Sequence, residues 1–172
     1  MLTEPTFFDG ALAHLDGARA AVSVPLLRKD FVISRYQLLE AAAACADAAL
    51  LIVAALDDRT LRQLLDDAHA LGLACLVEVH DTTEIARASD AGARVVGVNS
   101  RNLRTLAVDM DGLDRAASML PAGVIAVAES GIKTTADIAR LSAAGYHAFL
   151  VGERLIIQPD PGDALRELRG PA

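Results

Sequence analysis

The 172-residue sequence predicts an α/β fold, specifically a (β/α)8 TIM barrel that is incomplete at its front. Short apolar strands alternate with amphipathic helices, and a helix–glycine–strand unit repeats along the chain. No G-x-G-x-x-G fingerprint of an open dinucleotide-binding sheet follows any strand. Because a complete barrel has eight strands in about 250 residues, we expect roughly a quarter to a third of it to be missing.

The repeat consists of a helix end, a glycine and an apolar strand. Three copies place Gly72 before residues 73–77, Gly92 before 95–98 and Gly145 before 148–151. A glycine suits the left-handed residue that ends a helix and releases the chain into the next strand. A looser copy at Cys45-Ala46-Asp47 precedes a strand over 50–53, and apolar runs predict further strands over 24–27 and 124–128, which makes six full strands.

Helix start signals fall between these strands. We expect helices to be capped at Asp57 or Asp58, at Asp81 with Glu84, and at Thr134. Further helices are expected over 11–21 and 163–169. Leu2-Thr3 resembles the tail of a strand, and Gly170-Pro171-Ala172 resembles a natural stop. We therefore expect one partial barrel domain over residues 1–172, with barrel strands 3 to 8 complete and a remnant of strand 2.

Composition narrows the class of protein. The chain is 53% apolar and 23% charged, which is typical of a folded domain, and no apolar run approaches the roughly 20 residues of a membrane span. Met1 to Pro5 shows no export signal, so a cytoplasmic protein without membrane partners is expected. A net charge of -7 disfavours nucleic acid as a partner. Cys45 and Cys75 lack metal-ligand spacing and are expected to fill the core, without a metal site.

Polar residues follow the strands at the end where (β/α)8 barrels carry their chemistry. A Lys, two Glu and an Asn that converge at the barrel mouth would supply a proton donor, a proton acceptor and an orienting amide. Taken singly, each of these residues is also consistent with an ordinary polar residue that ends a strand near solvent. For Lys29, a structural salt bridge with Asp30 is a further alternative. The strand ends are Thr3-Glu4, Arg28-Lys29-Asp30, Glu78-Val79-His80, Asn99-Ser100-Arg101-Asn102, Glu129-Ser130-Gly131 and Gly152-Glu153-Arg154.

The last two strand ends indicate a phosphate site. Ser130-Gly131 before a helix that opens at Thr134, and Gly152 before a short turn, would expose backbone N–H groups where barrels commonly hold phosphate. Glycines at strand ends also arise from packing alone. Phe7, Phe8 and Phe31 are expected either to line a pocket for a flat ring or to pack in the core, and His80 lies beside the expected mouth.

Taken in order, these motifs resemble indole-3-glycerol phosphate synthase of tryptophan biosynthesis. The resemblance covers essentially the whole chain in the family's order and spacing. It rests on Leu2-Thr3-Glu4 with Phe8 and Gly10, Leu27-Arg28-Lys29-Asp30-Phe31, Leu50-Leu51-Ile52, Glu78-Val79-His80, Gly97-Val98-Asn99-Ser100-Arg101-Asn102-Leu103, Ala128-Glu129-Ser130-Gly131-Ile132 and Phe149-Leu150-Val151-Gly152-Glu153.

The resemblance implies a carboxy-lyase that acts without metal or organic cofactor on a phosphorylated small molecule, 1-(o-carboxyphenylamino)-1-deoxyribulose 5-phosphate. The ring closes onto the sugar carbonyl, and carbon dioxide and water are lost. By resemblance, Lys29 is the general acid for ring closure and Glu78 a partner in proton transfer during dehydration. Asn99 and Glu129 orient the substrate, with Ser130 beside Glu129 in the catalytic set.

The resemblance also implies a set of substrate-binding residues. Three of them wall the aromatic ring, one meets the anthranilate carboxylate, and backbone N–H groups of the last three hold the phosphate. In that order they are Phe8, Phe31 and Leu50; Arg101; and Gly131, Gly152 and Glu153.

The sequence departs from the family at its front, because nothing before Met1 supplies the catalytic Glu and the substrate-binding Lys of the family's first strand. Two unpaired sheet edges would favour self-association or binding of a complementing N-terminal chain. The hypotheses are therefore a shortened form of an active synthase that is impaired alone, a non-catalytic remnant, or another phosphate-binding barrel. The third class includes phosphoribosylanthranilate isomerase and the tryptophan synthase alpha subunit, which the Arg28 to Phe31 and Asn99 to Arg101 motifs disfavour.

Overall fold

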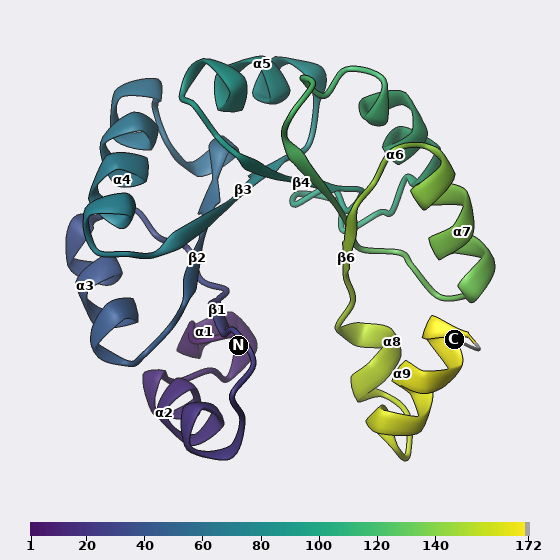
Figure 1. Cartoon of the computed structure of the whole chain (residues 1–172), viewed down its shortest axis with the longest axis horizontal. Helices are drawn as coiled ribbons and strands as arrows, with labels where there is room; N and C mark the ends of the chain where they lie inside the picture. Colours follow the sequence, from purple (N-terminus) through teal and green to yellow (C-terminus); the bar gives the residue numbers. More distant parts are fainter. Residues whose placement is uncertain (171–172) are drawn as a thin grey trace. The chain divides into compact units, whose positions relative to one another are not determined.

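A computed structural model describes residues 1–170 and contains six short strands, which pair in parallel within each part of the chain (Figure 1). The predicted α/β class is therefore confirmed. The chain divides into two compact units. The first comprises Met1–Glu78 and Ala86–Arg94, and the second comprises Val79–Ile85 and the described residues from Val95 onward. Pro171 and Ala172 of the predicted stop lie outside the described residues.

In the first unit, strand β1 pairs with β2, and β2 pairs with β3. Helices α3 and α4 lie side by side against β2 (Figure 1). The last residue of β3 and the first half of α5 belong to the second unit. The elements are α1 (Pro5–Phe8), α2 (Leu12–Ala21), β1 (Leu27–Arg28), α3 (Arg35–Ala43), β2 (Ala48–Ile52), a 3-10 turn (Val53–Ala55), α4 (Asp58–Ala70), β3 (Ala74–Val79) and α5 (Thr82–Asp90).

Helix α4 shows how the sequence pattern becomes structure. Its buried residues are Leu61, Leu64, Leu65 and Ala68, a spacing that places them on one face of a helix. The helix begins where predicted, because the Asp57 side chain accepts a hydrogen bond from the backbone N–H of Thr60. The apolar face therefore packs against the sheet, while most of the charged residues remain exposed to solvent.

Strand β1 is shorter than the predicted strand over 24–27, and the side chains around it explain the difference. The Asp47 carboxylate accepts the N–H of Leu26 at 2.6 Å, and Arg19 donates to the carbonyl of Val24, also at 2.6 Å. These backbone groups are thus satisfied without a strand partner. At the other edge of β1, Leu2 forms an isolated parallel bridge with Lys29.

In the second unit, β4 pairs with β5 and β5 with β6. Helix α6 packs on β4, and α9 packs against both α7 and α8. The buried core includes Leu113 and Leu141, and the Tyr146 hydroxyl donates to the carbonyl of Leu113 at 2.8 Å. The elements are β4 (Val95–Asn99), α6 (Met110–Ala117), β5 (Ile125–Glu129), α7 (Thr135–Ala143), β6 (Ala148–Leu150), α8 (Glu153–Ile156) and α9 (Pro161–Arg169).

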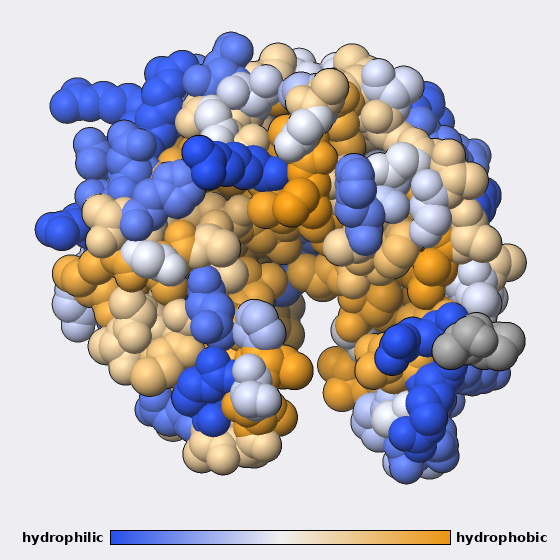
Figure 2. Space-filling model, viewed as in Figure 1, coloured by the Kyte–Doolittle hydropathy of each residue, from blue (hydrophilic) through white to orange (hydrophobic). Residues whose placement is uncertain are grey.

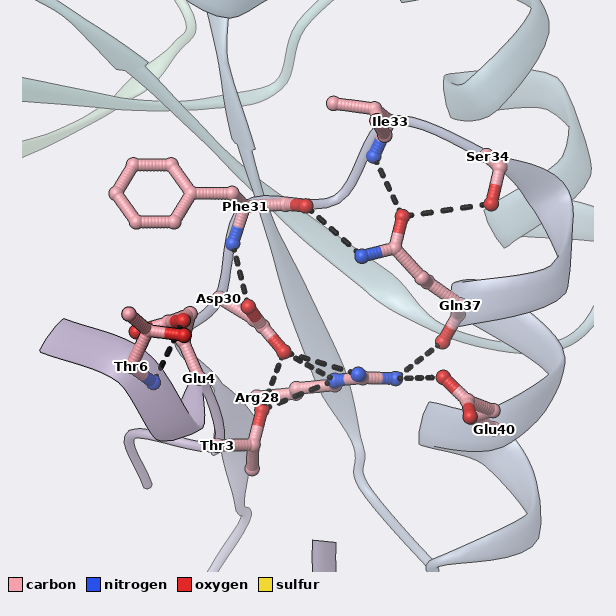
Figure 3. Close-up of polar contacts among 10 residues, drawn as sticks. All are labelled: Thr3, Glu4, Thr6, Arg28, Asp30, Phe31, Ile33, Ser34, Gln37 and Glu40. Atoms are coloured by element: carbon pink, nitrogen blue, oxygen red, sulfur yellow. Dashed lines mark hydrogen bonds and ion pairs between the residues drawn. The ribbon is translucent and has the colours of Figure 1, made fainter. Parts of the chain in front are cut away.

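Arg28 is buried and joins three parts of the first unit (Figure 3). Its Nη2 donates to Asp30 Oδ2 at 2.9 Å, and its Nε donates to the Thr3 hydroxyl at 3.2 Å. Its Nη1 donates to the carbonyl of Gln37 at 2.6 Å and to Glu40 Oε2 at 3.2 Å. The guanidinium therefore ties the N-terminal segment and β1 to helix α3, and a buried cation requires this many acceptors.

The two cysteines differ in environment. Cys75 is buried on β3, and burial raises the pKa of its thiol to about 11. Cys45 is exposed and has a φ of 56°, just after the end of α3. The expectation that Cys45 fills the core is wrong, because a left-handed residue at a helix end directs its side chain away from the packed face.

Large apolar side chains lie at the surface of each unit. In the first unit, Phe7 on α1 is 79% exposed. In the second, hydrophobic residues appear at the surface over α8 (Figure 2), where Ile156 and Ile157 are 72% and 70% exposed. None of the helices within residues 1–170 has the length and apolar content that a membrane crossing requires.

Replacing Arg28 tests the buried guanidinium. Arg28→Met should lower the free energy of unfolding by about 3 kcal/mol, because Asp30 would keep a buried charge without its cation. Urea unfolding measures the change. The matched control is Arg35→Met, because Arg35 forms an ion pair with Asp67 at 3.4 Å while its side chain remains 61% exposed. An equal loss of stability in the two variants would show that the Arg28 guanidinium does not stabilise the first unit more than an exposed arginine does.

Candidate active site

Lys29 and Glu78 form an ion pair just beyond β1 and near the end of β3. Lys29 Nζ lies 3.3 Å from Glu78 Oε2, and the side chains are 28% and 1% exposed. The alternative salt bridge between Lys29 and Asp30 is not the one formed, because Asp30 binds Arg28 and Thr3 instead. An ammonium group in contact with a buried carboxylate can exchange a proton with a ligand or with its partner.

Phe8 and Phe31 stack on each other with ring centroids 6.4 Å apart. They are 47% and 38% exposed, so core packing does not account for their position. Figure 3 shows the Phe31 ring directed away from the Arg28 cluster. Leu50 is buried on β2, two residues before Ile52, which pairs with Glu78, so Leu50 faces the same side of the sheet as Glu78.

Asn99 and Glu129 are the last residues of β4 and β5, and they pair in register. Partners in a parallel ladder direct their side chains to the same face, and these two are 8% and 1% exposed. Asn99 Oδ1 accepts hydrogen bonds from Ser130 Oγ at 2.8 Å and from the backbone N–H of Arg101 at 3.0 Å. Because only the amide oxygen can accept, these donors fix the orientation of the Asn99 amide.

The turn after β5 has an unusual backbone. Ser130 and Gly131 both have positive φ, at 66° and 73°. A Cβ on Gly131 would clash with Met110 Sδ and would lie 2.6 Å from Val108 Cγ1, and the positive φ strains any other residue, so this position favours glycine. The Ser130 carbonyl accepts the Ser100 hydroxyl at 3.1 Å, which holds the turn beside the end of β4.

The start of α7 limits which N–H groups a ligand can use. Thr134 and Asp137 form the predicted cap as a reciprocal capping box. The Asp137 carboxylate accepts the N–H groups of Lys133 and Thr134, at 3.0 and 2.8 Å. Burial opposes the charge of Asp137, but these hydrogen bonds outweigh it and lower the pKa of the carboxyl. An anion at this turn would therefore have to bind the preceding N–H groups of Gly131 and Ile132.

Arg101 and Glu153 form an ion pair between the end of β4 and the start of α8. Arg101 Nη2 donates to Glu153 Oε2 at 2.7 Å. Gly152 is exposed at the N-cap of α8, and a Cβ there would meet no atom within 4 Å. The first N–H groups of a helix have no partner within it, so this start can receive an anion.

Sequence reasoning missed several supporting residues and misassigned one contact. Asp81 accepts the N–H of Glu84 at 2.9 Å, as expected of a cap. Glu84, however, binds the backbone N–H and the Nδ1 of His80, at 2.7 and 3.2 Å. Ser100 was named at its strand end but given no role, and Asp137 was missed, although the T-x-x-D spacing from Thr134 to Asp137 is a readable signal. Within residues 1–170, no group of three or more His, Cys, Asp or Glu side chains could hold a metal ion.

The motif order agrees with a family comparison. A family model described as "Indole-3-glycerol phosphate synthase" matches residues 1–168. The chain belongs to the indole-3-glycerol phosphate synthase family. The other phosphate-binding barrels considered from sequence are thereby set aside.

Curated relatives carry the same name. The synthases of Parafrankia sp. and Mycobacteroides abscessus are each 54% identical to the chain over 168 residues, and that of Nocardioides sp. is 53% identical over 170. These matches cover 98%, 98% and 99% of the chain but 63%, 62% and 65% of the relatives. The chain thus spans less than two thirds of the length of these synthases.

A solved structure shares the fold alone. "Structure of FabK from Thermotoga maritima" matches with a TM-score of 0.69 over 89% of the chain and 50% of that protein, at 12% sequence identity. At this identity the match indicates a shared arrangement of elements and carries no information on activity.

Asp30 next to Lys29 gives a prediction for pH. Burial opposes its charge, but hydrogen bonds from Thr3 and Arg28 outweigh burial and lower its pKa. A lowered folded pKa means that Asp30 stabilises the fold above the unfolded pKa of about 3.9, and that this stability is lost as pH falls through the folded value.

We therefore expect Asp30→Asn to destabilise the protein at pH 7 and to reduce the loss of stability on acidification below about pH 4. Unfolding by urea at a series of pH values measures both. Thr3→Val removes one donor and should produce a smaller change in the same direction. An Asp30→Asn variant with the pH dependence of the wild type would contradict the assignment.

Proposed function

We propose that this chain serves the indole-3-glycerol phosphate synthase reaction. The substrate is 1-(o-carboxyphenylamino)-1-deoxyribulose 5-phosphate, and its conversion involves ring closure, decarboxylation and dehydration without metal or organic cofactor. Family membership supports the proposal, and the observation that carries it is the ion pair between Lys29 and the buried Glu78. This pair places a proton donor and a proton acceptor 3.3 Å apart.

Lys29 acts as the general acid of ring closure in this proposal. Its ammonium would protonate the sugar carbonyl oxygen as the new carbon–carbon bond forms. Glu78 holds the Lys29 side chain in place before the reaction and takes part in proton transfer during dehydration. The 1% exposure of Glu78 supports this division, because a buried carboxylate interacts strongly with a nearby cation.

Asn99, Glu129 and Ser130 orient the substrate. The amide of Asn99 is held by two donors, so it needs no reorganisation when substrate binds. Glu129 is its register partner on β5. Fixed polar groups of this kind lower the entropic cost of the bound geometry.

The remaining residues bind the two ends of the substrate. Phe8 and Phe31, with Leu50, wall the aromatic ring, and their stacked and partly exposed rings support this role. Arg101 meets the anthranilate carboxylate by exchanging its present carboxylate partner, Glu153. Backbone N–H groups at Gly131, Gly152 and Glu153 hold the phosphate.

The proposal includes a barrel and a partner. The strands are those of a (β/α)8 barrel, incomplete within this chain, with polar residues at the carboxyl ends of successive strands. Self-association or a complementing chain would cover apolar side chains such as Phe7 in the first unit and Ile156 in the second. A net charge of -7 disfavours nucleic acid as a partner.

The direct test is formation of indole-3-glycerol phosphate followed by fluorescence. It uses the chain alone and the chain mixed with a peptide covering the part of the Parafrankia relative that the chain does not match. We expect turnover in the mixture and little or none by the chain alone, because the reaction needs acid and base groups from the whole barrel. A folded mixture without turnover would refute the proposal.

Lys29 provides the mutational test. Lys29→Met should reduce turnover in the active mixture by at least about 100-fold, the usual contribution of a general acid, with little change in melting temperature. The control is Arg59→Met, which removes a cation from the exposed face of α4 and should leave turnover unchanged. A large fall in melting temperature would instead assign Lys29 a structural role.

A further inference from the structure

The last helix, α9, is tied to the starts of both α7 and α8 through one residue, Glu167. Its carboxylate accepts a hydrogen bond from Arg154 Nη2 at 3.1 Å. Its backbone carbonyl accepts the Thr135 hydroxyl, also at 3.1 Å. One position of α9 therefore contacts the two helices that follow β5 and β6.

Arg154 extends this connection to the turn after β5. Its Nε donates to the carbonyl of Lys133 at 3.3 Å, in the turn between Gly131 and Thr134. The Arg154 side chain is 23% exposed and that of Glu167 is 75% exposed. A planar guanidinium that binds two acceptors holds them at a fixed angle, which a lysine cannot do.

The start of α8 depends on such contacts. The helix has only four residues, and its N-cap, Gly152, makes no side-chain capping bond. A single helical turn is unstable alone, because nucleation fixes several residues for very few hydrogen bonds. By contrast, α7 has its own capping box. The position of the first α8 residues is therefore set by neighbours, and Glu167 holds Arg154 from α9.

We infer that Arg154 and Glu167 are positioning residues for the phosphate of the substrate. They brace the Gly131 turn and the Gly152–Glu153 turn against α9, so that the N–H groups of both turns keep a fixed geometry. The inference rests on the proposed phosphate site. A pre-arranged set of donors binds an anion more tightly than one that must be ordered on binding.

The sign of one variant distinguishes positioning from direct contact. Glu167→Gln weakens the hold on Arg154 without changing the shape of the side chain. If Arg154 bound phosphate itself, its release from a carboxylate would strengthen phosphate binding. If the pair positions the turns, the same variant weakens binding.

The experiment titrates the full chain with inorganic phosphate and follows the amide signals of Gly131 and Gly152 by NMR. We expect Arg154→Ala and Glu167→Gln each to weaken phosphate binding roughly fivefold. The double variant should bind phosphate as tightly as Arg154→Ala alone, because both substitutions remove the same contact between Arg154 and Glu167. The matched control is Arg166→Ala, which removes an ion pair with Asp163 from the same helix and touches neither turn. It should leave the affinity unchanged.

Amide hydrogen exchange without ligand gives a second measurement. Arg154→Ala should accelerate exchange at residues 131–135 and 152–155 relative to the wild type and to Arg166→Ala. If the wild type binds phosphate and Glu167→Gln binds it equally well or more tightly, this inference is overturned and the proposed function still stands. A wild type that binds no phosphate would overturn the phosphate site and the inference together.

Discussion

The buried guanidinium of Arg28 is the constraint on which the first unit depends. A cation with a side chain 5% exposed must have its donors satisfied, and the acceptors come from the N-terminal segment, from Asp30 and from α3. Because neighbouring residues of a strand face opposite sides, fixing Arg28 toward α3 directs Lys29 to the other face. Lys29 there meets Glu78. Arg28 of the structural ion cluster and Lys29 of the proposed catalytic pair are thus neighbours in the sequence.

In the second unit, backbone geometry holds the buried polar side chains in position. Register between β4 and β5 sets Asn99 beside Glu129, and the left-handed Ser130 turns its hydroxyl back onto the Asn99 amide. Gly131 then passes close to Met110, where a Cβ would clash with the present side chains of Met110 and Val108. The polar groups at the ends of β4 and β5 are therefore arranged by strand register and by contacts of short side chains. Such rigidity suits groups that must orient a substrate.

The sequence predicted the elements well where local physics decides them. Continuous apolar runs gave β2 to β6 within a few residues, and the caps at Asp57 and Thr134 were correct because a side chain there satisfies a nearby backbone N–H. Predictions failed where distant residues intervene. The start of β1 was misplaced because Asp47 and Arg19 satisfy the backbone of residues 24–26, and Cys45 was placed in the core although it is exposed.

The sequence by itself determined the α/β class, the order of the strands and the residue types at their ends, because periodicity, turn residues and motifs are local properties of the chain. Only the tertiary structure decided which of these residues meet. Lys29 binds Glu78, 49 positions away, and not its neighbour Asp30, and Arg101 binds Glu153, 52 positions away. The physical reason is that a charged side chain takes its partner from the residues that strand register and burial bring within about 4 Å, and sequence separation does not encode that distance.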